Sequence, residues 1–215
     1  IFFPMINSLD SNLSQVEDHC ACPTVTVTPE VVKAAMTKEG DLFGKLGIRY
    51  LNPMLNISDE VLFERQMFMA FSTLFGLSRK ENKIAVKYGY QTLDGYKKHL
   101  RKQGRELLES LVNNQQIGIV ILARAYHNDS GINHEIPDQL QALGYPILTM
   151  DALPIDEEVL SKIFEQDLKQ GRINNGMAID DVWKNSYSEN TNQKIWAAKF
   201  VARHPNLVAL ELSSF

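Results

Sequence analysis

The sequence has little of the material that marks a membrane-spanning or secreted protein. No stretch of its 215 residues reaches the roughly 18 to 20 continuous apolar residues of a membrane-spanning helix. The N-terminus has no basic region followed by a hydrophobic run, which is the pattern of a secretory signal peptide. With 44% hydrophobic and 22% charged residues, the composition is typical of a soluble globular protein. We therefore expect a cytoplasmic protein with no membrane partner.

The best-defined catalytic and nucleotide-binding motifs are also missing. The glycine-containing stretch "GDLFGKLG" (40–47) lacks both a strand–loop–helix setting and the Gly-Lys-Ser/Thr ending of a phosphate-binding loop. The sequence contains neither a Gly-x-Ser-x-Gly nucleophile elbow nor a His-Glu-x-x-His zinc helix. We expect no ATP site in this chain, and the sequence assigns no general base or paired nucleophile.

An excess of positive charge is missing too. The net charge of −4 gives no general attraction for a phosphate backbone. The one dense basic run, "KKHLRKQGR" (97–105), has helical spacing on a polar stretch, which is typical of a solvated helix face. We therefore expect no nucleic-acid partner.

The sequence does contain a series of short apolar runs, each followed by turn residues or by a helical pattern. The runs are continuous in hydrophobicity rather than alternating, as in parallel strands that helices cover on both faces. They predict an α/β fold, with a mostly parallel sheet in a Rossmann-like three-layer arrangement. The predicted strands are 1–6, 24–27, 48–53, 117–123, 145–150 and 206–212.

Helices are predicted between these runs by their start and stop signals. Thr28 is expected to cap a helix whose first residue is Pro29, where the missing N–H of proline costs nothing. A helix over 133–143 is expected to end at Gly144, and a last helix covers about 190–203. These segments complete the expected alternation of strands and helices.

Residues 58–113 interrupt this alternation and predict a helical insertion. A Ser-Asp-Glu sequence opens its first helix, and Ser78 with Glu81 forms a capping box for the second. We expect one α/β domain over 1–215 that carries this insertion. Because the sequence opens on Ile1 inside a predicted strand, we also expect the domain to be an internal part of a larger polypeptide.

One predicted strand ends in a concentration of polar residues. The stretch "ARAYHNDSGINHEIP" (123–137) follows the strand 117–123 and leads into the helix over 133–143. In open α/β sheets the ligand crevice lies beyond the carboxyl ends of the strands. The residues expected to line such a crevice are Arg124, Tyr126, His127, Asn128, Asn133 and His134.

Part of this stretch has a simpler explanation. Residues 128–131 are sufficient to form a turn, and Asn133 is suited to cap the helix that follows. Turn formation does not account for Arg124, which can pair with a phosphate or carboxylate, or for Tyr126 and His127, which can exchange protons. A ligand-binding role and a purely structural role both stay open.

The second candidate site holds both cysteines of the chain. Cys20 and Cys22 lie one residue apart in "EDHCACP" (17–23). In a reducing compartment, such a pair is a plausible part of a zinc or iron–sulfur site. A complete site needs about four ligands, and His19 or the acidic residues before it would have to add to the pair. A structural role for two buried cysteines is equally open.

These stretches together resemble a known family. In order along the chain, they are "FFPMI", "EDHCACPTVTVTPEVVKAAM", "RYLNPML" and "IGIVILARAYHNDSGINHEIPDQLQALGYPILTMDALP". They resemble the middle region of the large 2-hydroxyacyl-CoA dehydratase activases, also called CoA-substrate-specific enzyme activases. In those proteins the region lies between ATP-binding activator domains and a dehydratase-subunit-like domain. The resemblance spans most of the chain.

The resemblance implies a part in an anaerobic electron-transfer system, in which an ATPase drives an electron into a dehydratase that carries iron–sulfur clusters and binds acyl-CoA. This chain would then be a dehydratase-like electron-transfer or acyl-CoA- and cluster-binding module, and not the ATPase. Its partners would be the activator and dehydratase-like parts of the same polypeptide. Cys20 and Cys22 would be partial ligands of a 4Fe–4S cluster, which this chain alone would not retain.

Two other hypotheses compete with this one. The domain could be a non-catalytic scaffold or protein-interaction domain of the same large protein, with structural cysteines and a polar stretch that only forms a turn. It could also be an enzyme acting alone on a phosphate- or carboxylate-bearing molecule, but that hypothesis rests only on Arg124, His127 and His134. We expect no independent activity of this chain.

Overall fold

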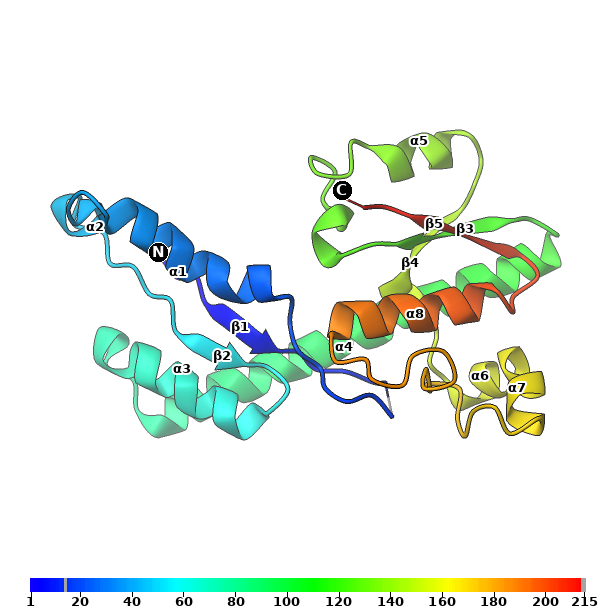
Figure 1. The fold of residues 1–215 in the computed structure, drawn as a ribbon, viewed down its shortest axis with the longest axis horizontal. Coiled ribbons are helices and arrows are strands. Elements are labelled where there is room, and N and C mark those ends of the chain that lie inside the picture. The colour runs from blue at the N-terminus through cyan, green and yellow to red at the C-terminus, as the bar shows by residue number, and fades with distance from the viewer. Residues whose placement is uncertain (14, 214–215) are drawn as a thin grey trace. The chain divides into compact units, whose positions relative to one another are not determined.

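A computed structural model describes residues 1–13 and 15–213 of the chain (Figure 1). Its elements confirm the α/β class, because the described residues form eight α-helices together with strands that pair in parallel. The chain divides into two compact units, which we describe separately. Unit 1 contains Ile1–Asn12, Asp18–Thr92 and Tyr187–Glu189, and unit 2 contains Leu13–Glu17, Leu93–Ser186 and Asn190–Phe215.

Unit 1 is built on a two-stranded parallel sheet. The strands β1 and β2 pair in register from Met5 opposite Met54. The helix α1 packs on β1, and α3 packs beside β2. The elements of this unit that precede residue 79 are β1 (Met5–Ser8), α1 (Pro23–Thr37), α2 (Leu42–Lys45), β2 (Met54–Asn56) and α3 (Glu60–Phe75).

The predicted strand at 24–27 is wrong, because these residues belong to α1. Pro23 stands at the first helical position, which a residue without an N–H suits. The hydroxyl of Thr28 donates to the carbonyl oxygen of Thr24 at 2.5 Å and so finds a partner inside the helix. Pro29 lies buried within α1 and does not begin it. The alternating β-branched residues resemble a strand, but the chain context overrides that propensity.

The strands predicted at 1–6 and 48–53 are displaced by a few residues toward the C-terminus. Backbone pairing does start early, at a parallel bridge between Phe2 and Leu51. Regular strand structure then begins only after Pro4 and Pro53, because proline has no N–H to donate to the ladder.

The range predicted as a helical insertion contains two helices. In α3, Asp59 caps the first turn by accepting a hydrogen bond from the backbone N–H of Leu62 at 2.9 Å. The capping box is confirmed, since the N–H of Ser78 donates to Glu81 Oε2 at 2.9 Å and the N–H of Glu81 donates to Ser78 Oγ at 3.3 Å. The helix that follows, α4 (Arg79–Asn113), contributes to both units.

Unit 2 contains a three-stranded parallel sheet in the order β4–β3–β5. These strands confirm the predictions at 117–123, 145–150 and 206–212. Figure 1 shows α5 on one side of this sheet and α8 on the other. Besides the C-terminal part of α4, the elements of unit 2 are β3 (Gly118–Leu122), η1 (Ala125–Asn128), α5 (Ile136–Ala142), β4 (Ile147–Thr149), η2 (Met150–Ala152), α6 (Glu157–Ile163), α7 (Glu165–Lys169), α8 (Glu189–Val201) and β5 (Leu207–Glu211). The first residue of α8, Glu189, belongs to unit 1.

Both faces of the central strand β3 are buried. Val120 and Leu122 belong to a core that α4 and α8 complete, with Phe200 fully buried in it. Ile119 and Ile121 face a second cluster, against which Leu140 of α5 packs. This burial explains why the sequence of β3 is apolar throughout. The finer prediction of a Rossmann-like three-layer arrangement for the whole chain is not confirmed.

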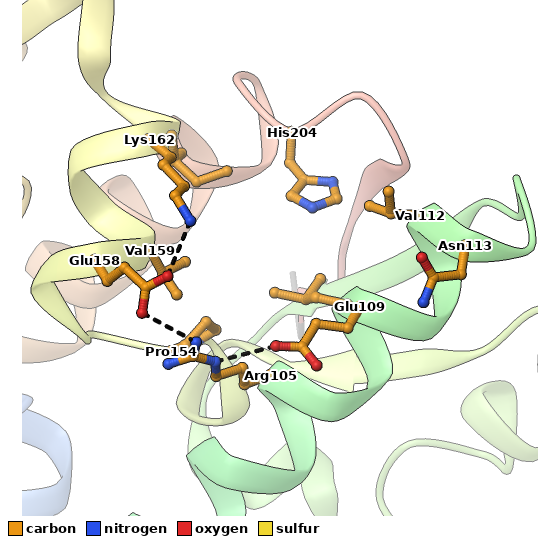
Figure 2. Close-up of a pocket in the computed structure, with 11 residues that line it drawn as sticks. Arg105, Glu109, Val112, Asn113, Pro154, Glu158, Val159, Lys162 and His204 are labelled. Carbon is orange, nitrogen blue, oxygen red and sulfur yellow. Dashed lines mark hydrogen bonds and ion pairs between the residues drawn. The ribbon is translucent and has the colours of Figure 1, made fainter.

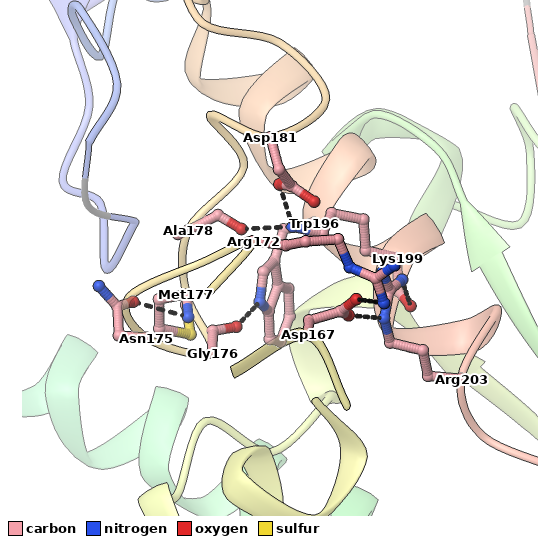
Figure 3. Close-up of polar contacts among 10 residues, drawn as sticks. All are labelled: Asp167, Arg172, Asn175, Gly176, Met177, Ala178, Asp181, Trp196, Lys199 and Arg203. Atoms are coloured by element: carbon pink, nitrogen blue, oxygen red, sulfur yellow. Dashed lines mark hydrogen bonds and ion pairs between the residues drawn. The ribbon is translucent and has the colours of Figure 1, made fainter. Parts of the chain in front are cut away.

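Buried polar contacts attach the segment before α8 to that helix (Figure 3). Lys199 is almost fully buried and donates to the carbonyl oxygen of Ala178 at 2.8 Å and to the carboxylate of Asp181. The indole N–H of Trp196 donates to the carbonyl oxygen of Gly176 at 2.8 Å. The irregular segment around these residues is therefore fixed without helix or strand pairing.

Across residues 1–13 and 15–213, every helix is too short or too polar to cross a lipid bilayer.

Candidate functional site

A pocket lies at the carboxyl ends of β3 and β5 in unit 2. Its volume of about 500 Å³ is within the roughly 300–1,000 Å³ usual for small-molecule sites. The backbone N–H of Leu212, just past β5, donates to the carbonyl oxygen of Leu122 at the end of β3 at 3.2 Å, which joins the two strand ends. We call this the carboxyl-end pocket, and the described residues that line it are His127, Ile132, Asn133, His134, Ile136, Leu212 and Ser213.

Three of the six predicted crevice residues line this pocket, namely His127, Asn133 and His134. Arg124 precedes η1 and lies outside the lining. Tyr126, within η1, has an exposed fraction of 37%, and its ring lies 4.4 Å from the ring of His127. Asn128 ends η1 and is exposed. The sequence therefore predicted the location of a pocket better than its full set of side chains.

His127 is a buried polar residue of the carboxyl-end pocket. Its side chain is 7% exposed, and its Nδ1 atom has no hydrogen-bond partner among the described residues. Burying a polar atom without a partner costs free energy, so buried ring nitrogens are normally hydrogen-bonded. The pocket lining therefore includes a residue whose buried ring nitrogen has no hydrogen-bond partner in the described part of the chain.

Asn133 connects two segments of the pocket wall through hydrogen bonds of its buried amide. It is 6% exposed, its Nδ2 donates to the carbonyl oxygen of His127 at 2.9 Å, and its Oδ1 accepts from the N–H of Glu135 at 2.9 Å. The simpler prediction made it the cap of a helix over 133–143, but α5 begins only at Ile136. Its amide instead links η1 to the segment that precedes α5.

The backbone next to Asn133 is held in an unusual conformation. His134 and Glu135 have φ angles of +54° and +58°, in the left-handed region that residues other than glycine rarely adopt. Each such residue costs about 1–3 kcal/mol unless local contacts compensate for it. The two hydrogen bonds of Asn133 supply such contacts, and the result is that His134 lines the pocket instead of joining a longer helix.

The turn that the simpler explanation predicts is also present. Asp129 Oδ1 accepts a hydrogen bond from the N–H of Gly131 at 2.9 Å. The carbonyl oxygen of Asp129 accepts from the N–H of Asn133 at 3.0 Å. The polar stretch therefore divides into a turn at 129–131 and pocket-lining residues on either side of it.

Four lining residues were missed by the sequence analysis. Ile132 and Ile136 lie inside the polar stretch, and their apolar side chains carry no signal of a ligand site. Leu212 and Ser213 come from the other end of the chain. These two residues could have been predicted, because 206–212 was a predicted strand and the carboxyl ends of neighbouring parallel strands meet at one edge of a sheet.

The two predicted metal ligands lie in unit 1. Cys20 is fixed by its backbone, which donates to the carbonyl oxygen of Tyr187 at 2.8 Å and accepts from the N–H of Glu189 at 3.0 Å. Its thiol donates to Asp18 Oδ2 at 3.3 Å. Burial, followed by this hydrogen bond, raises the pKa of the Cys20 thiol. Cys22 immediately precedes α1 and is half-buried.

These residues do not fit a complete 4Fe–4S cluster. Cluster ligands are thiolates, and the carboxylate of Asp18 favours the protonated thiol of Cys20. The nearby imidazole of His19 has its Nδ1 at 2.9 Å from Glu189 Oε2, so it already has a partner. Within the described part of the chain, no three His, Cys, Asp or Glu side chains are grouped so that they could hold a metal ion. Partial ligation by Cys20 and Cys22 stays a prediction from the sequence.

A second pocket of about 520 Å³ lies between α4 and α6 in unit 2 (Figure 2). Its charged residues are paired with one another. The guanidinium of Arg105 donates to Glu109 at 3.2 Å and to Glu158 at 3.3 Å, and Lys162 donates to Glu158 at 2.9 Å. Figure 2 also shows the ring of His204 pointing into this space. The mutual pairing indicates a link between two helices more than a ligand site.

Comparisons with known proteins place the chain in a family. A family model described as CoA enzyme activase uncharacterised domain matches residues 1–153. The same sequence matched no curated protein and no solved structure. The matched region covers well over half of the 215 residues, and it includes both cysteines and the polar stretch after β3. The chain therefore belongs to the CoA enzyme activase uncharacterised domain family.

Proposed function

We propose that this domain binds acyl-CoA for a CoA enzyme activase, and that the carboxyl-end pocket holds the acyl end of the thioester. The observation that carries the proposal is that His127 lines the pocket and that its buried Nδ1 atom has no partner among the described residues. Membership of a CoA enzyme activase family supports a CoA-linked ligand, and the resemblance to the dehydratase activases implies an acyl thioester.

The lining suits the two parts of an acyl thioester. A neutral imidazole with its proton on Nδ1 would donate a hydrogen bond from His127 to the thioester carbonyl oxygen. The side chains of Ile132, Ile136 and Leu212 would contact the hydrocarbon part of the acyl group. Asn133 would keep His127 in place through the hydrogen bond to its carbonyl oxygen. ATP hydrolysis is not part of this proposal.

Calorimetric titration of the chain with butyryl-CoA tests the proposal. We expect binding, and we expect His127→Ala to weaken it about tenfold or more, because one buried hydrogen bond is worth about 1.5 kcal/mol. His99→Ala is the matched control, since His99 is exposed on α4 and lies outside the pocket. Absence of binding, or equal affinity of His127→Ala and the unchanged chain, would contradict the proposal.

A second candidate function is favoured by the surface of unit 1. Several large apolar side chains there are more than half exposed, and protein-interaction sites often present apolar surface. They include Val31 at 60%, Leu46 at 63%, Val61 at 61%, Met69 at 73% and Phe75 at 65%. This supports the scaffold alternative, in which unit 1 contacts another part of the same polypeptide. Replacing Met69 and Phe75 by serine should then weaken co-purification with the remaining domains expressed separately.

A further inference from the structure

We infer that the carboxyl-end pocket selects CoA thioesters with an apolar, uncharged acyl group over those whose acyl group ends in a carboxylate. The inference rests on the proposed function and adds the class of acyl group to it. It is carried by the side chains of the pocket and not by the chemistry of CoA, which all such ligands share.

Among the described residues that form the pocket there is no lysine, arginine, aspartate or glutamate. The apolar contribution comes from Ile132, Ile136 and Leu212, and the polar contribution from two imidazoles, one amide and one hydroxyl. A terminal carboxylate placed here would lose its hydration without gaining an arginine or lysine partner, which strongly disfavours binding.

The charged residues next to the pocket do not change this conclusion. Glu211, at the end of β5, pairs with Lys194, whose Nζ lies 2.9 Å from its Oε1. Asp129 is engaged in the turn through the N–H of Gly131. Glu135, which precedes α5, adds another negative group beside the pocket. Asp129 and Glu135 would therefore disfavour an anionic acyl group, the charge of Glu211 is offset by Lys194, and Arg124 lies outside the lining.

The polar atoms of the pocket match a carbonyl group better than a carboxylate. His127 Nδ1 is a single buried position that can form one hydrogen bond. Asn133 is already committed on both sides of its amide, to the carbonyl oxygen of His127 and to the N–H of Glu135. Of the two buried residues of the lining, only His127 has an unsatisfied polar atom, which matches the one oxygen of a thioester and leaves the rest of the acyl chain to apolar contacts.

Pentanoyl-CoA and glutaryl-CoA provide a matched pair of probes, because they have the same number of acyl carbons and differ in a terminal methyl against a carboxylate. We expect pentanoyl-CoA to bind at least about tenfold more tightly than glutaryl-CoA in calorimetric titrations. From propionyl-CoA to pentanoyl-CoA, affinity should rise about fourfold per methylene if the chain is fully buried. Equal or tighter binding of glutaryl-CoA would overturn the inference.

A charge-introducing variant tests where the acyl group lies. Leu212→Lys places a cation in the lining and should shift the preference toward glutaryl-CoA by about tenfold or more. Leu143→Lys is the matched control, because Leu143 is 73% exposed at the end of α5 and lies outside the pocket, so the preference should not change. An unchanged preference in both variants would show that the acyl group does not lie beside Leu212 and would overturn the inference.

The same titrations separate the two proposals. If pentanoyl-CoA, glutaryl-CoA and free CoA all fail to bind, the proposed function fails. If pentanoyl-CoA and glutaryl-CoA bind equally well and His127→Ala weakens both, the proposed function stands and the selection for uncharged acyl groups is wrong. If free CoA binds as tightly as pentanoyl-CoA, the acyl group gains nothing from the pocket, and both proposals fail.

Discussion

Asp167 is an acidic residue buried between two guanidinium groups. Its side chain is 2% exposed, and its carboxylate accepts hydrogen bonds from Arg203 and from Arg172 (Figure 3). The hydrogen bond from Arg203, followed by that from Arg172, lowers the pKa of Asp167 despite the opposing effect of burial. A buried carboxylate with two cations depends on both, and removing its charge leaves them without their partner.

We predict that Asp167→Asn lowers the free energy of unfolding by about 3 kcal/mol at neutral pH, the low end for breaking a buried pair because both arginines are partly solvated. The matched control is Glu165→Gln on the same helix, whose ion pair with Lys169 is exposed and which should change stability by less than about 1 kcal/mol. Urea unfolding of both variants gives the comparison. A decrease in the free energy of unfolding of less than about 1 kcal/mol in Asp167→Asn would contradict the prediction.

The same variant has a defined pH dependence. Because the pKa of Asp167 is below the value of 3.8 expected for the unfolded chain, the unfolded state binds the proton first as the pH falls. The stability that Asp167 contributes is therefore present above about pH 4 to 5 and is lost as the pH falls through 3.8 toward the folded pKa. The stability difference between the unchanged chain and Asp167→Asn should become smaller in that acidic range.

His204 predicts a second pH effect, at higher pH. Its Nδ1 accepts a hydrogen bond from the N–H of Asn206 at 3.2 Å, and burial lowers its pKa. The unfolded chain, with a value of 6.5, therefore binds a proton more readily, and stability is lost as the pH falls below about 6.5. His204→Asn keeps an acceptor near the N–H and removes the titration. Its melting temperature should fall less between pH 7 and pH 5 than that of the unchanged chain.

At the scale of elements, the contact of α4 with η2 in unit 2 depends on one glycine. A Cβ atom at Gly104 would lie 1.8 Å from the carbonyl oxygen of Ala152, which is a backbone atom and cannot rotate away. The helix therefore approaches η2 more closely than any other residue would allow. Gly95, on the same helix, is exposed, and a Cβ atom there would meet nothing within 4 Å.

These two glycines predict opposite effects of the same substitution. Gly104→Ala should lower the free energy of unfolding by about 3 kcal/mol, because overpacking forces the backbone to shift. Gly95→Ala should raise it by about 0.5–1 kcal/mol, because alanine favours a helix interior over glycine. Thermal unfolding of both variants decides the point, and a neutral Gly104→Ala would show that α4 does not contact η2 in this way.

The elements that the sequence predicted correctly are those with one dominant signal. The strands of unit 2 were recognisable because β3 is apolar on both faces, which only a buried parallel strand requires. The helix α1 was recognised only from Pro29 onward, because the Thr-Val alternation before it has the period of a strand and Pro29 was taken for the first helical position instead of Pro23. The packing of the folded chain, and not the local sequence, determines whether such a segment forms a strand or a helix.

The candidate site was predictable in part for the same reason. His127, Asn133 and His134 follow a clear strand end, and the rule about carboxyl ends identified them. The left-handed backbone at His134 and Glu135 has no sequence signal, because glycine is absent there. The contribution of Leu212 depends on β5 lying next to β3, which follows from the sheet order and not from any local pattern.

At the scale of the whole molecule, the cysteine pair predicts the metal content of the chain. Two thiols, one of them held as a thiol by Asp18, are too few ligands for a stable 4Fe–4S cluster. We expect the chain, purified without oxygen, to contain iron and sulfide well below one cluster per molecule. A stoichiometric cluster would contradict this expectation. If Cys22 ligates a cluster in the complete polypeptide, Cys22→Ser there should lower the iron content.

The most direct test of the account is whether a ligand gives His127 Nδ1 its missing partner. Nitrogen NMR of the chain labelled at its histidine rings can follow this atom while pentanoyl-CoA is added, with His99 as the internal reference. If the acyl group binds beside His127, pentanoyl-CoA should cause a saturable shift of the His127 Nδ1 resonance that is absent with free CoA, and the His99 resonances should not change. Pentanoyl-CoA that binds without moving this resonance, or that does not bind, would contradict the account.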